Sequence, residues 1–352
     1  MESNESNSDP NVIDSLRDSA RMRPAMYIGG VGAKALADFV HGVFENLLSL
    51  SKANDSTTTI VIDKDATISF ETSLNVDVGI IADLTRNYRA YYLHVLPHFC
   101  RKLTILSALR SVCFEDGLCS QIDHQYSANM PPRTKIIMEP DRAIFTSVDI
   151  DFHYLSANLQ ILATLNRGAT IVLLDRRGEL FSRNIFHYPE GVGYWFEQEE
   201  KAKGALLKLI IDTEVKGNRY QICMGWGSIF RPMVRSFAGS HETTLGGSLV
   251  DGVVHGISLA CRRYLMAAGK KCRFSRKELF GSLVLVCSVT GKEYSYAGAT
   301  KEAIYEPEIR KDIAPVVRDL ILAKLRSDPA VAETLLMWFD ADTLKWYRDA
   351  RR

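Results

Sequence analysis

The sequence lacks the features of a membrane-bound or secreted protein. No hydrophobic run is long enough to cross a bilayer, and residues 1–10 form a polar arm without the apolar core of a signal peptide. The seven cysteines are odd in number and form no CxxC pair. This usage favours reduced thiols in a cytoplasmic protein over a disulfide framework, and it predicts no contact with a membrane.

An excess of charge of one sign is also missing. The chain carries 43 lysines and arginines against 42 aspartates and glutamates, a formal net charge of +1. No overall field attracts it to nucleic acid, so a contact with DNA would need a local basic patch. A metal site has one candidate, His94, His98 and Cys100, but Pro97 between the histidines disfavours a helical i, i+4 pair. We expect these residues at a helix end near the core, and no bound metal.

The 352 residues, of which 46% are hydrophobic and 24% charged, suit two soluble globular domains. The strongest periodicity lies in residues 33–51, where apolar residues follow i, i+3, i+4, i+7 spacing and predict a core-facing helix. A helix is also predicted at 11–22, and alternating β-branched residues predict a hairpin at 57–73. Residues 80–108 are expected to be mostly helical. We further expect a helix at 154–166 and strands near 110–117, 134–139, 143–149, 169–175 and 179–187.

The second half of the chain has a different pattern. Predicted strands at 205–213, 217–226 and 229–237 are followed by a long helix at 247–268, a strand at 282–289 and two terminal helices. Strands and helices do not alternate strictly in either half, which favours an α+β fold over a doubly wound sheet. We expect a flexible arm at 1–10, a first domain at 11–192 and a second domain at 193–352.

Seven segments carry a resemblance that extends over nearly the whole chain. In order they are LRDSARMRPAMYIGG (16–30), HGVFEN (41–46), RTKIIMEPDRAIF (133–145), LATLNRGATIVLLDRR (162–177), FHYPEGVGYWFE (186–197), SFAGSHETTLGGSLVDGVVHGI (236–257) and GSLVLVCSVTGKEYSYAGATKEAIYEPEIR (281–310). They resemble, in the same order, motifs of the DNA gyrase B and topoisomerase IV ATPase-subunit family.

This resemblance implies a fold and a function. The first domain is expected to be a GHKL (Bergerat-type) ATPase-like sandwich, and the second a transducer domain with a ribosomal S5 domain 2-like fold. The implied activity is that of the ATPase region of a type II DNA topoisomerase. Family members dimerise through the N-terminal arm and the first domain, so a homodimer, or a mixed dimer with a gyrase-type subunit, is the expected assembly.

The first long helix of the family carries two residues of the ATP site. A glutamate acts as general base toward water, and an asparagine one turn later holds Mg²⁺. Glu45 matches the glutamate, on the helix face that also carries Asp38 and Ser49. Ser49 stands in place of the asparagine, and a hydroxyl is a poorer Mg²⁺ ligand than an amide carbonyl. Without the resemblance, these three residues would indicate only a solvated helix face.

Two glycine-rich segments complete the family's site, one reading adenine with an aspartate and one wrapping the phosphates with backbone N–H groups. Residues 71–77, ETSLNVD, align with the first but lack its aspartate and glycines, leaving Ser73 as a hydrogen-bonding side chain. Residues 86–110 replace the second and contain no glycine. Their Cβ atoms would obstruct the close approach of phosphate to the backbone.

Two further residues match the family's nucleotide contacts. Thr134 corresponds to a threonine beside the adenine, and Lys301 to the transducer lysine that reaches the terminal phosphate, although Ala299 replaces the glutamine before it. Without the resemblance they would be an ordinary strand threonine and an exposed lysine. Loss of one preorganised donor typically costs about a hundredfold or more in rate, so the loss of most of them predicts very weak or no ATP hydrolysis. We expect no bound cofactor.

A local basic concentration is present near the end of the long second-domain helix. It resembles a phosphate-contact patch for DNA, but it equally fits a solvated helix end and loop. Its residues are Arg262, Arg263, Lys270, Lys271, Arg273, Arg276 and Lys277. The E-G-D-S and D-x-D-x-D signatures of the family's cleavage domain are absent, so we expect that this chain alone does not cleave DNA.

Three hypotheses follow. The first is a pseudo-ATPase that serves as a binding or regulatory module. The second is a working DNA gate that uses ATP and Mg²⁺, with phosphate contacts from Arg86, Arg89, Arg101 or Lys102. The third is a gyrase mimic that forms mixed dimers with the true subunit. A pocket beside Glu45 filled by an aromatic ring would favour the first hypothesis, and the candidate rings are Tyr91, Tyr92 and Phe99.

Overall fold

The computed structural model describes residues 10–50, 55–74, 91–107, 111–123, 133–203, 205–227, 232–269, 279–281, 283–291, 294–298 and 301–337. The chain divides into two compact units, Met1–Pro189 and Glu190–Arg352. Each unit has its own hydrophobic core, and the described strands form one large sheet in the first unit and two smaller sheets in the second.

The first unit begins with three helices, α1 (Pro10–Met22), α2 (Pro24–Ile28) and α3 (Ala33–Leu50). Pro24 occupies the first turn of α2, where a missing N–H costs nothing. Gly29 ends this helix with a φ of 74°, a left-handed conformation that glycine adopts without strain. The RMRPAMYIGG stretch therefore holds the end of α1 and a one-turn helix that begins at a proline and ends at a glycine.

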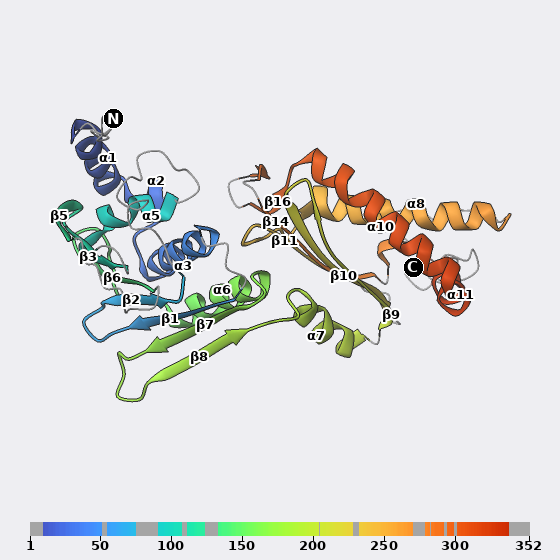
Figure 1. Cartoon of the computed structure of the whole chain (residues 1–352), viewed down its shortest axis with the longest axis horizontal. Helices are drawn as coiled ribbons and strands as arrows, with labels where there is room; N and C mark the ends of the chain where they lie inside the picture. The colour runs from blue at the N-terminus through green and yellow to red at the C-terminus, as the bar shows by residue number, and fades with distance from the viewer. Residues whose placement is uncertain are drawn as a thin grey trace, which may run out of the picture. The chain divides into compact units, whose positions relative to one another are not determined.

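An eight-stranded sheet forms the body of the first unit (Figure 1). Its strand order is β5-β4-β3-β6-β2-β1-β7-β8, with β1 and β7 parallel and the other pairs antiparallel. The bounds are β1 Ser56–Ile62, β2 Ile68–Thr72, β3 Cys100–Leu106, β4 Ser111–Glu115, β5 Leu118–Asp123, β6 Thr134–Pro140, β7 Ala169–Asp175 and β8 Ser182–His187.

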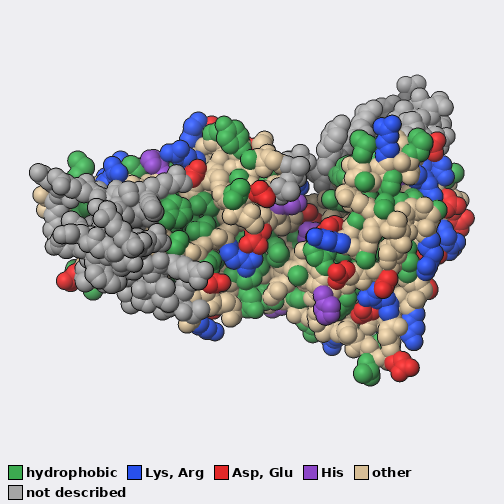
Figure 2. All heavy atoms as spheres, turned by 180° about the vertical axis from the view of Figure 1, so that it is seen from behind, with side chains coloured by type: hydrophobic (Ala, Val, Ile, Leu, Met, Phe, Trp, Pro, Cys, Tyr) green, Lys and Arg blue, Asp and Glu red, His purple; other side chains and the backbone are tan. Residues whose placement is uncertain are grey.

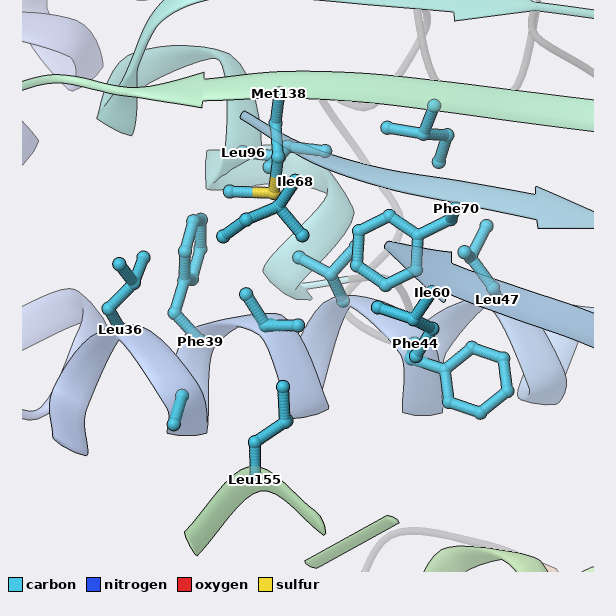
Figure 3. Close-up of a cluster of buried hydrophobic side chains, with 14 of the residues drawn as sticks. Leu36, Phe39, Phe44, Leu47, Ile60, Ile68, Phe70, Leu96, Met138 and Leu155 are labelled. Carbon is cyan, nitrogen blue, oxygen red and sulfur yellow. The ribbon is translucent and has the colours of Figure 1, made fainter. Parts of the chain in front are cut away.

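Side chains alternate between the two faces of this sheet. Every second residue of β1, β2 and β6 is buried, and the residues between them are half-buried or exposed. Helix α3 places its apolar stripe on the buried face, and Figure 3 shows Phe39 of α3 pointing toward Ile68 of the sheet. The Phe44 ring lies 6.5 Å from the Phe70 ring, between centroids. Helix α6 (Phe152–Leu165), capped by the Asp151 side chain, adds Leu155 to the same core. The short helices α5 (Tyr91–Val95) and η3 (Leu96–Phe99) precede β3.

Two expectations about this unit were wrong. Residues 100–106, expected within a helical region, form strand β3, because Leu103 and Ile105 are buried between β4 and β6. Residues 143–149 form no strand. Ala143 lies in a turn, where its N–H is accepted by the Asp141 carboxylate. Further along, the Thr146 N–H donates to the Val31 carbonyl. Residues 80–90 lie outside the described part of the chain.

The second unit is a layer of strands covered by two long helices (Figure 1). Its sheets have the orders β12-β11-β14-β10-β9 and β13-β16-β15. The strands are β9 Ala205–Val215, β10 Asn218–Gly227, β11 Met233–Ala238, β12 His241–Glu242, β13 Gly246–Gly247, β14 Leu283–Thr290, β15 Tyr296–Ala297 and β16 Ala303–Ile304. The helices are α7 Gly193–Lys203, α8 Ser248–Ala267, α10 Pro307–Ser327 and α11 Pro329–Met337.

Helices α8 and α10 pack against each other through glycines on α8. A Cβ at Gly252 would lie 3.0 Å from the Cα of Arg310, and one at Gly256 would lie 2.6 Å from the carbonyl oxygen of Ala314. These distances are too short for any side chain, so glycine is required for this close approach. In the part of the chain described by the structure, no helix combines the length and the apolar character needed to cross a membrane.

Candidate nucleotide site

Helix α3 carries a cluster of titratable side chains on the face that points away from its apolar stripe. Asp38, His41 and Glu45 are half-buried, and the Asp38 carboxylate accepts the side-chain N–H of Asn158 on α6 at 3.4 Å. Burial lowers the pKa of His41, and the carboxylates of Glu45 and Asp38 oppose that shift. The predicted base Glu45 therefore lies beside an imidazole and a second carboxylate.

The aromatic ring of Tyr92 covers this part of α3. A Cβ at Gly42 would lie 2.5 Å from Cδ2 of Tyr92, so the ring rests directly on the helix backbone. Burial raises the pKa of Tyr92, and the charges of Glu45 and Asp38 raise it further. The Tyr92 ring is thus within electrostatic reach of the predicted base.

Asn46 fixes the helix that carries Tyr92. This buried side chain projects from α3, and its Oδ1 accepts the backbone N–H of Tyr92 at 2.7 Å and that of Leu93 at 3.4 Å. These N–H groups belong to the first turn of α5, where a helix has donors without intrahelical partners. The Asn46 side chain therefore caps the N-terminus of α5, although it belongs to α3.

Of the other rings named as candidates to fill the pocket, neither lies where Tyr92 does. The Tyr91 hydroxyl donates to the Tyr27 carbonyl at 3.1 Å, and its ring meets Tyr92 edge-on with 5.5 Å between centroids. Phe99 is fully buried in the core, 5.5 Å from the Phe39 ring centroid. The RMRPAMYIGG stretch, which contains Tyr27, therefore contacts the segment that carries Tyr92.

The residues aligned with the family's Mg²⁺ and adenine ligands are engaged elsewhere. The Ser49 hydroxyl donates to the carbonyl of Asn46 at 2.8 Å, back onto its own helix. The exposed Ser73 accepts the Thr57 N–H through Oγ at 2.9 Å and lies on the sheet face opposite that of the buried Thr72. Thr134 is fully buried and pairs with Thr72 in the sheet register. The structure thus brings Thr72 and Thr134 together beneath the helices, and it turns Ser73 away.

Lys301 lies in the second unit, with partners of its own. Its Nζ is 3.0 Å from Nε2 of His241 and 5.3 Å from the ring centroid of Tyr296. A neutral imidazole nitrogen accepts a hydrogen bond from an ammonium, so His241 holds the charged end of the lysine. Lys301 itself has a φ of 55°, an uncommon value for a residue with a Cβ.

The basic residues of the segment that replaces the glycine-rich loop are also paired where they are described. Arg101 on β3 makes a two-point ion pair with Glu139, and Lys102 lies 3.8 Å from Glu115. Arg86 and Arg89 lie outside the described residues.

The predicted DNA patch is described only at its start. Arg262 and Arg263 are exposed on the last turns of α8, and the charge of Arg263 helps Arg318 to lower the pKa of Asp319 on α10. On the face shown in Figure 2, basic and acidic side chains are interspersed. Five residues of the patch lie outside the described residues: Lys270, Lys271, Arg273, Arg276 and Lys277.

The His94, His98 and Cys100 segment lies at a helix end against the core. The Nδ1 atoms of His94 and His98 are buried without a hydrogen-bond partner among the described residues, and burial lowers the pKa of His98 to about 4. Burial raises the pKa of the Cys100 thiol. Within the described ranges, no group of three or more His, Cys, Asp and Glu side chains is arranged to hold a metal ion.

Comparison with known proteins agrees with the order of motifs and with the architecture. The family model for DNA gyrase B matches residues 191–346. The DNA gyrase B protein of Archaeoglobus fulgidus is 26% identical over 372 residues, covering 94% of this chain and 58% of the relative. That of Clostridium acetobutylicum is 23% identical and covers 92% and 56%. These matches support homology of the chain to the ATPase region of DNA gyrase B proteins. The chain spans about half the length of these curated relatives.

Solved structures confirm the fold expected for such a gyrase B homologue. The 43K ATPase domain of Thermus thermophilus gyrase B, determined with an aminocoumarin, superposes with a TM-score of 0.80 at 19% identity, covering 95% of this chain and 97% of that one. The topoisomerase IV ATP-binding domain of Francisella tularensis gives 0.75 at 19% identity, with coverages of 92% and 95%. The fold is therefore the GHKL ATPase domain followed by the transducer domain.

Sequence reasoning missed three residues of the gyrase B homologue, two in the first unit and one in the second. Asn46 and Gly42 received no role, and His241 was not expected beside Lys301. A signal existed for Asn46, since a polar residue beside the apolar stripe of a helix must find a partner when it is buried. The partner of Lys301 had no comparable signal, because His241 is 60 positions away.

Proposed function

We propose that this gyrase B homologue is a pseudo-ATPase, a binding or regulatory module that neither hydrolyses ATP nor binds it tightly. The contact between Asn46 and the first turn of α5 is the observation that carries the proposal. Helix α5 belongs to the segment that stands in place of the family's phosphate-wrapping loop. Its first-turn N–H groups are those a helix would offer to a phosphate, and the Asn46 amide already accepts two of them.

The Tyr92 ring adds a steric argument. It rests on Gly42, one turn of α3 before Glu45, where the family places the reacting end of the nucleotide beside its general base. A glycine in this segment would leave room for a phosphate near the backbone, and a tyrosine ring fills that room. Aligned residues that would bind Mg²⁺ or the terminal phosphate are also in use, because Ser49 bonds to its own helix and Lys301 to His241. The donor set of this chain does not fit ATP with Mg²⁺.

Calorimetry with a non-hydrolysable ATP analogue and Mg²⁺ tests the proposal. We expect no heat of binding at micromolar protein concentration, while a catalytically competent gyrase B ATPase domain in the same buffer supplies the positive control. Binding of the analogue with a micromolar dissociation constant would refute the pseudo-ATPase proposal.

A second candidate function is an ATP-driven DNA gate with an atypical lid. One observation favours it: Glu45 is half-buried beside His41, as a general base would be. It predicts steady-state ATP turnover that Glu45→Ala abolishes, with or without DNA. If turnover is absent in the wild-type protein and Glu45→Ala changes nothing, this candidate fails.

The proposed partners are a second copy of the chain or a gyrase-type subunit, and DNA through the patch at the end of α8. The relatives at about a quarter identity are gyrase B proteins, which supports a dimeric partner of the same kind. Co-purification with a gyrase subunit, followed by ultracentrifugation of the chain alone without nucleotide, separates a mixed dimer from a homodimer.

A further inference from the structure

Strand β8 lies at one end of the large sheet (Figure 1). It presents a mixture of exposed apolar and basic side chains. Phe186 points into the core and is 7% exposed, whereas Ile185 beside it is 54% exposed. Just before the strand, Leu180 and Phe181 are 91% and 68% exposed. Arg183 and His187, which share the face of Ile185, are exposed as well.

The neighbouring strands extend this surface into an apolar shelf. Ile185 lies opposite Val172 of β7, and Arg183 lies opposite Leu174. Next in the sheet, Val61 of β1 lies opposite Leu174. The half-buried Val172, Leu174 and Val61 thus form the floor beside the exposed Ile185. A strand laid beside β8 would place every second side chain on this shelf.

The charge of Arg183 is not neutralised within the part of the chain that the structure describes. Arg183 has no hydrogen-bond or ion-pair partner among the described residues, while the nearby Arg177 is paired with Asp175 and Asp149. Strand β8 itself, Ser182–His187, contains no acidic residue. Native edge strands are usually protected from pairing by charge, proline or cover. On β8 the protecting charge is a single arginine without a described partner, and it lies beside apolar side chains. This edge can therefore still pair with another strand, and it favours a strand that carries negative charge.

We propose that the β8 edge binds an extended acidic segment of a partner protein, which adds a ninth strand to the sheet. The edge of β8, with which no described strand pairs, supplies main-chain hydrogen bonds. Ile185 and the shelf take an apolar side chain, and Arg183 pairs with a carboxylate two positions away on the added strand. A second copy of β8 offers Arg183 no carboxylate. Antiparallel pairing centred on Ile185 sets Arg183 against His187, pairing centred on Arg183 sets two arginines together, and pairing centred on Asn184 sets Arg183 against Ile185.

This inference names a partner chemistry for the binding role proposed above, and it rests on that role. The probe is a fluorescein-labelled, terminally blocked peptide of threonines with a central valine and a glutamate two positions to each side. This symmetric pattern matches Arg183 and Ile185 in either strand direction. The control peptide carries lysine in place of both glutamates. Both are titrated into the full chain, with fluorescence anisotropy as the readout.

We expect the wild-type chain to bind the glutamate peptide about fivefold more tightly than the lysine peptide, which corresponds to the upper size of one cross-strand ion pair. Arg183→Glu should reverse the preference, and Ile185→Asp should abolish binding of the glutamate peptide. Arg176→Glu is the matched control, because Arg176 is also an exposed arginine but precedes the strand, 3.9 Å from Asp63. It should keep the wild-type preference. Hydrogen exchange of residues 182–187 should slow when the glutamate peptide is added.

Several outcomes would overturn the inference. These are no anisotropy change up to millimolar peptide, equal binding of the two peptides, protection from exchange at sites other than β8, or dimerisation of the free chain that Arg183→Glu abolishes. Because the peptides contain no nucleotide, the outcome of the peptide titration can be told apart from the outcome of the calorimetry with the ATP analogue. Tight binding of the ATP analogue would refute the pseudo-ATPase proposal, and failure of the peptide to bind would refute the docking proposal.

Discussion

Asn46 accepts the backbone N–H of Tyr92 at 2.7 Å, so a side chain of helix α3 caps the first turn of helix α5. The two residues are 46 positions apart, and this bond joins the first long helix to the segment before β3. Through it, the position of the Tyr92 ring depends on the amide of Asn46 as well as on packing.

Asn46→Ala is expected to lower the free energy of unfolding of the first unit by about 1–3 kcal/mol, because two buried N–H groups lose their acceptor. Urea unfolding followed by far-UV circular dichroism measures the change. The tryptophans at 195, 226, 338 and 346 all lie in the second unit, so their fluorescence is an internal control that should not shift. Ser49→Ala is the matched variant, and its exposed, local bond predicts a change of less than about 0.5 kcal/mol. Equal effects of the two variants would contradict the capping role.

Gly42 and Tyr92 should show strong coupling in a double-mutant cycle. Gly42→Ala alone places a methyl group 2.5 Å from the tyrosine ring and should destabilise the first unit by about 1–3 kcal/mol. In the Tyr92→Ala background the same change meets no ring, and the helix propensity of alanine should make it stabilising by about 0.5–1 kcal/mol. Thermal unfolding of the four proteins measures the cycle. The same sign for Gly42→Ala in both backgrounds would show that the ring does not rest on the helix.

Arg21 anchors α1 to the first unit through an ion pair with Asp141, whose side chain is 8% exposed, and through a bond to the His98 carbonyl. Arg21→Ala leaves the buried carboxylate without its cation and should cost about 3–5 kcal/mol. Arg17→Ala is the control, since Arg17 donates to the Asp116 carbonyl and pairs with the exposed Asp18. We expect it to cost about 1 kcal/mol. Urea unfolding distinguishes the two, and an Arg21→Ala effect as small as that of Arg17→Ala would contradict the anchoring role.

The first unit should lose stability in mild acid because of His98. Burial lowers the pKa of His98 from 6.5 to about 4. Between these values the unfolded chain binds a proton that the folded chain does not, so the free energy of unfolding falls with falling pH, by up to about 1.4 kcal/mol per unit for one histidine. Burial also lowers the pKa values of His41 and His94, which adds to the slope.

Urea titrations at intervals between pH 6.5 and pH 4.5 test this dependence, and His98→Gln should flatten it. His153→Gln replaces an exposed histidine of the same unit and should leave the slope as it is in the wild type. An unchanged slope in His98→Gln would mean that His98 does not carry the acid sensitivity.

Local patterns predicted the elements whose burial is one-sided. The helix expected at 33–51 is observed at Ala33–Leu50, and the hairpin expected at 57–73 is β1 with β2. In both cases the spacing of apolar residues already states which face is buried. Strand β3 was missed because the fit of Leu103 and Ile105 depends on partners in β4 and β6, and no local pattern shows those partners.

The candidate site was less predictable than the fold. Resemblance located Glu45, Ser49 and Lys301, but it gave no account of what these side chains touch. The decisive contacts of Asn46 join residues 46 and 47 positions apart, and they use backbone N–H groups, which every non-proline residue has. A buried side-chain amide is expected to have a hydrogen-bond partner, but the sequence does not show which group that partner is.

The contact between Gly42 and Tyr92 also limits how this chain can change over time. A single substitution of Tyr92 by glycine would remove a packed ring and leave a void. Such losses cost about 3–5 kcal/mol for an aromatic side chain, a large part of the stability of most domains. A single substitution at Gly42 meets the ring. Each residue therefore constrains which side chains the other position can accept.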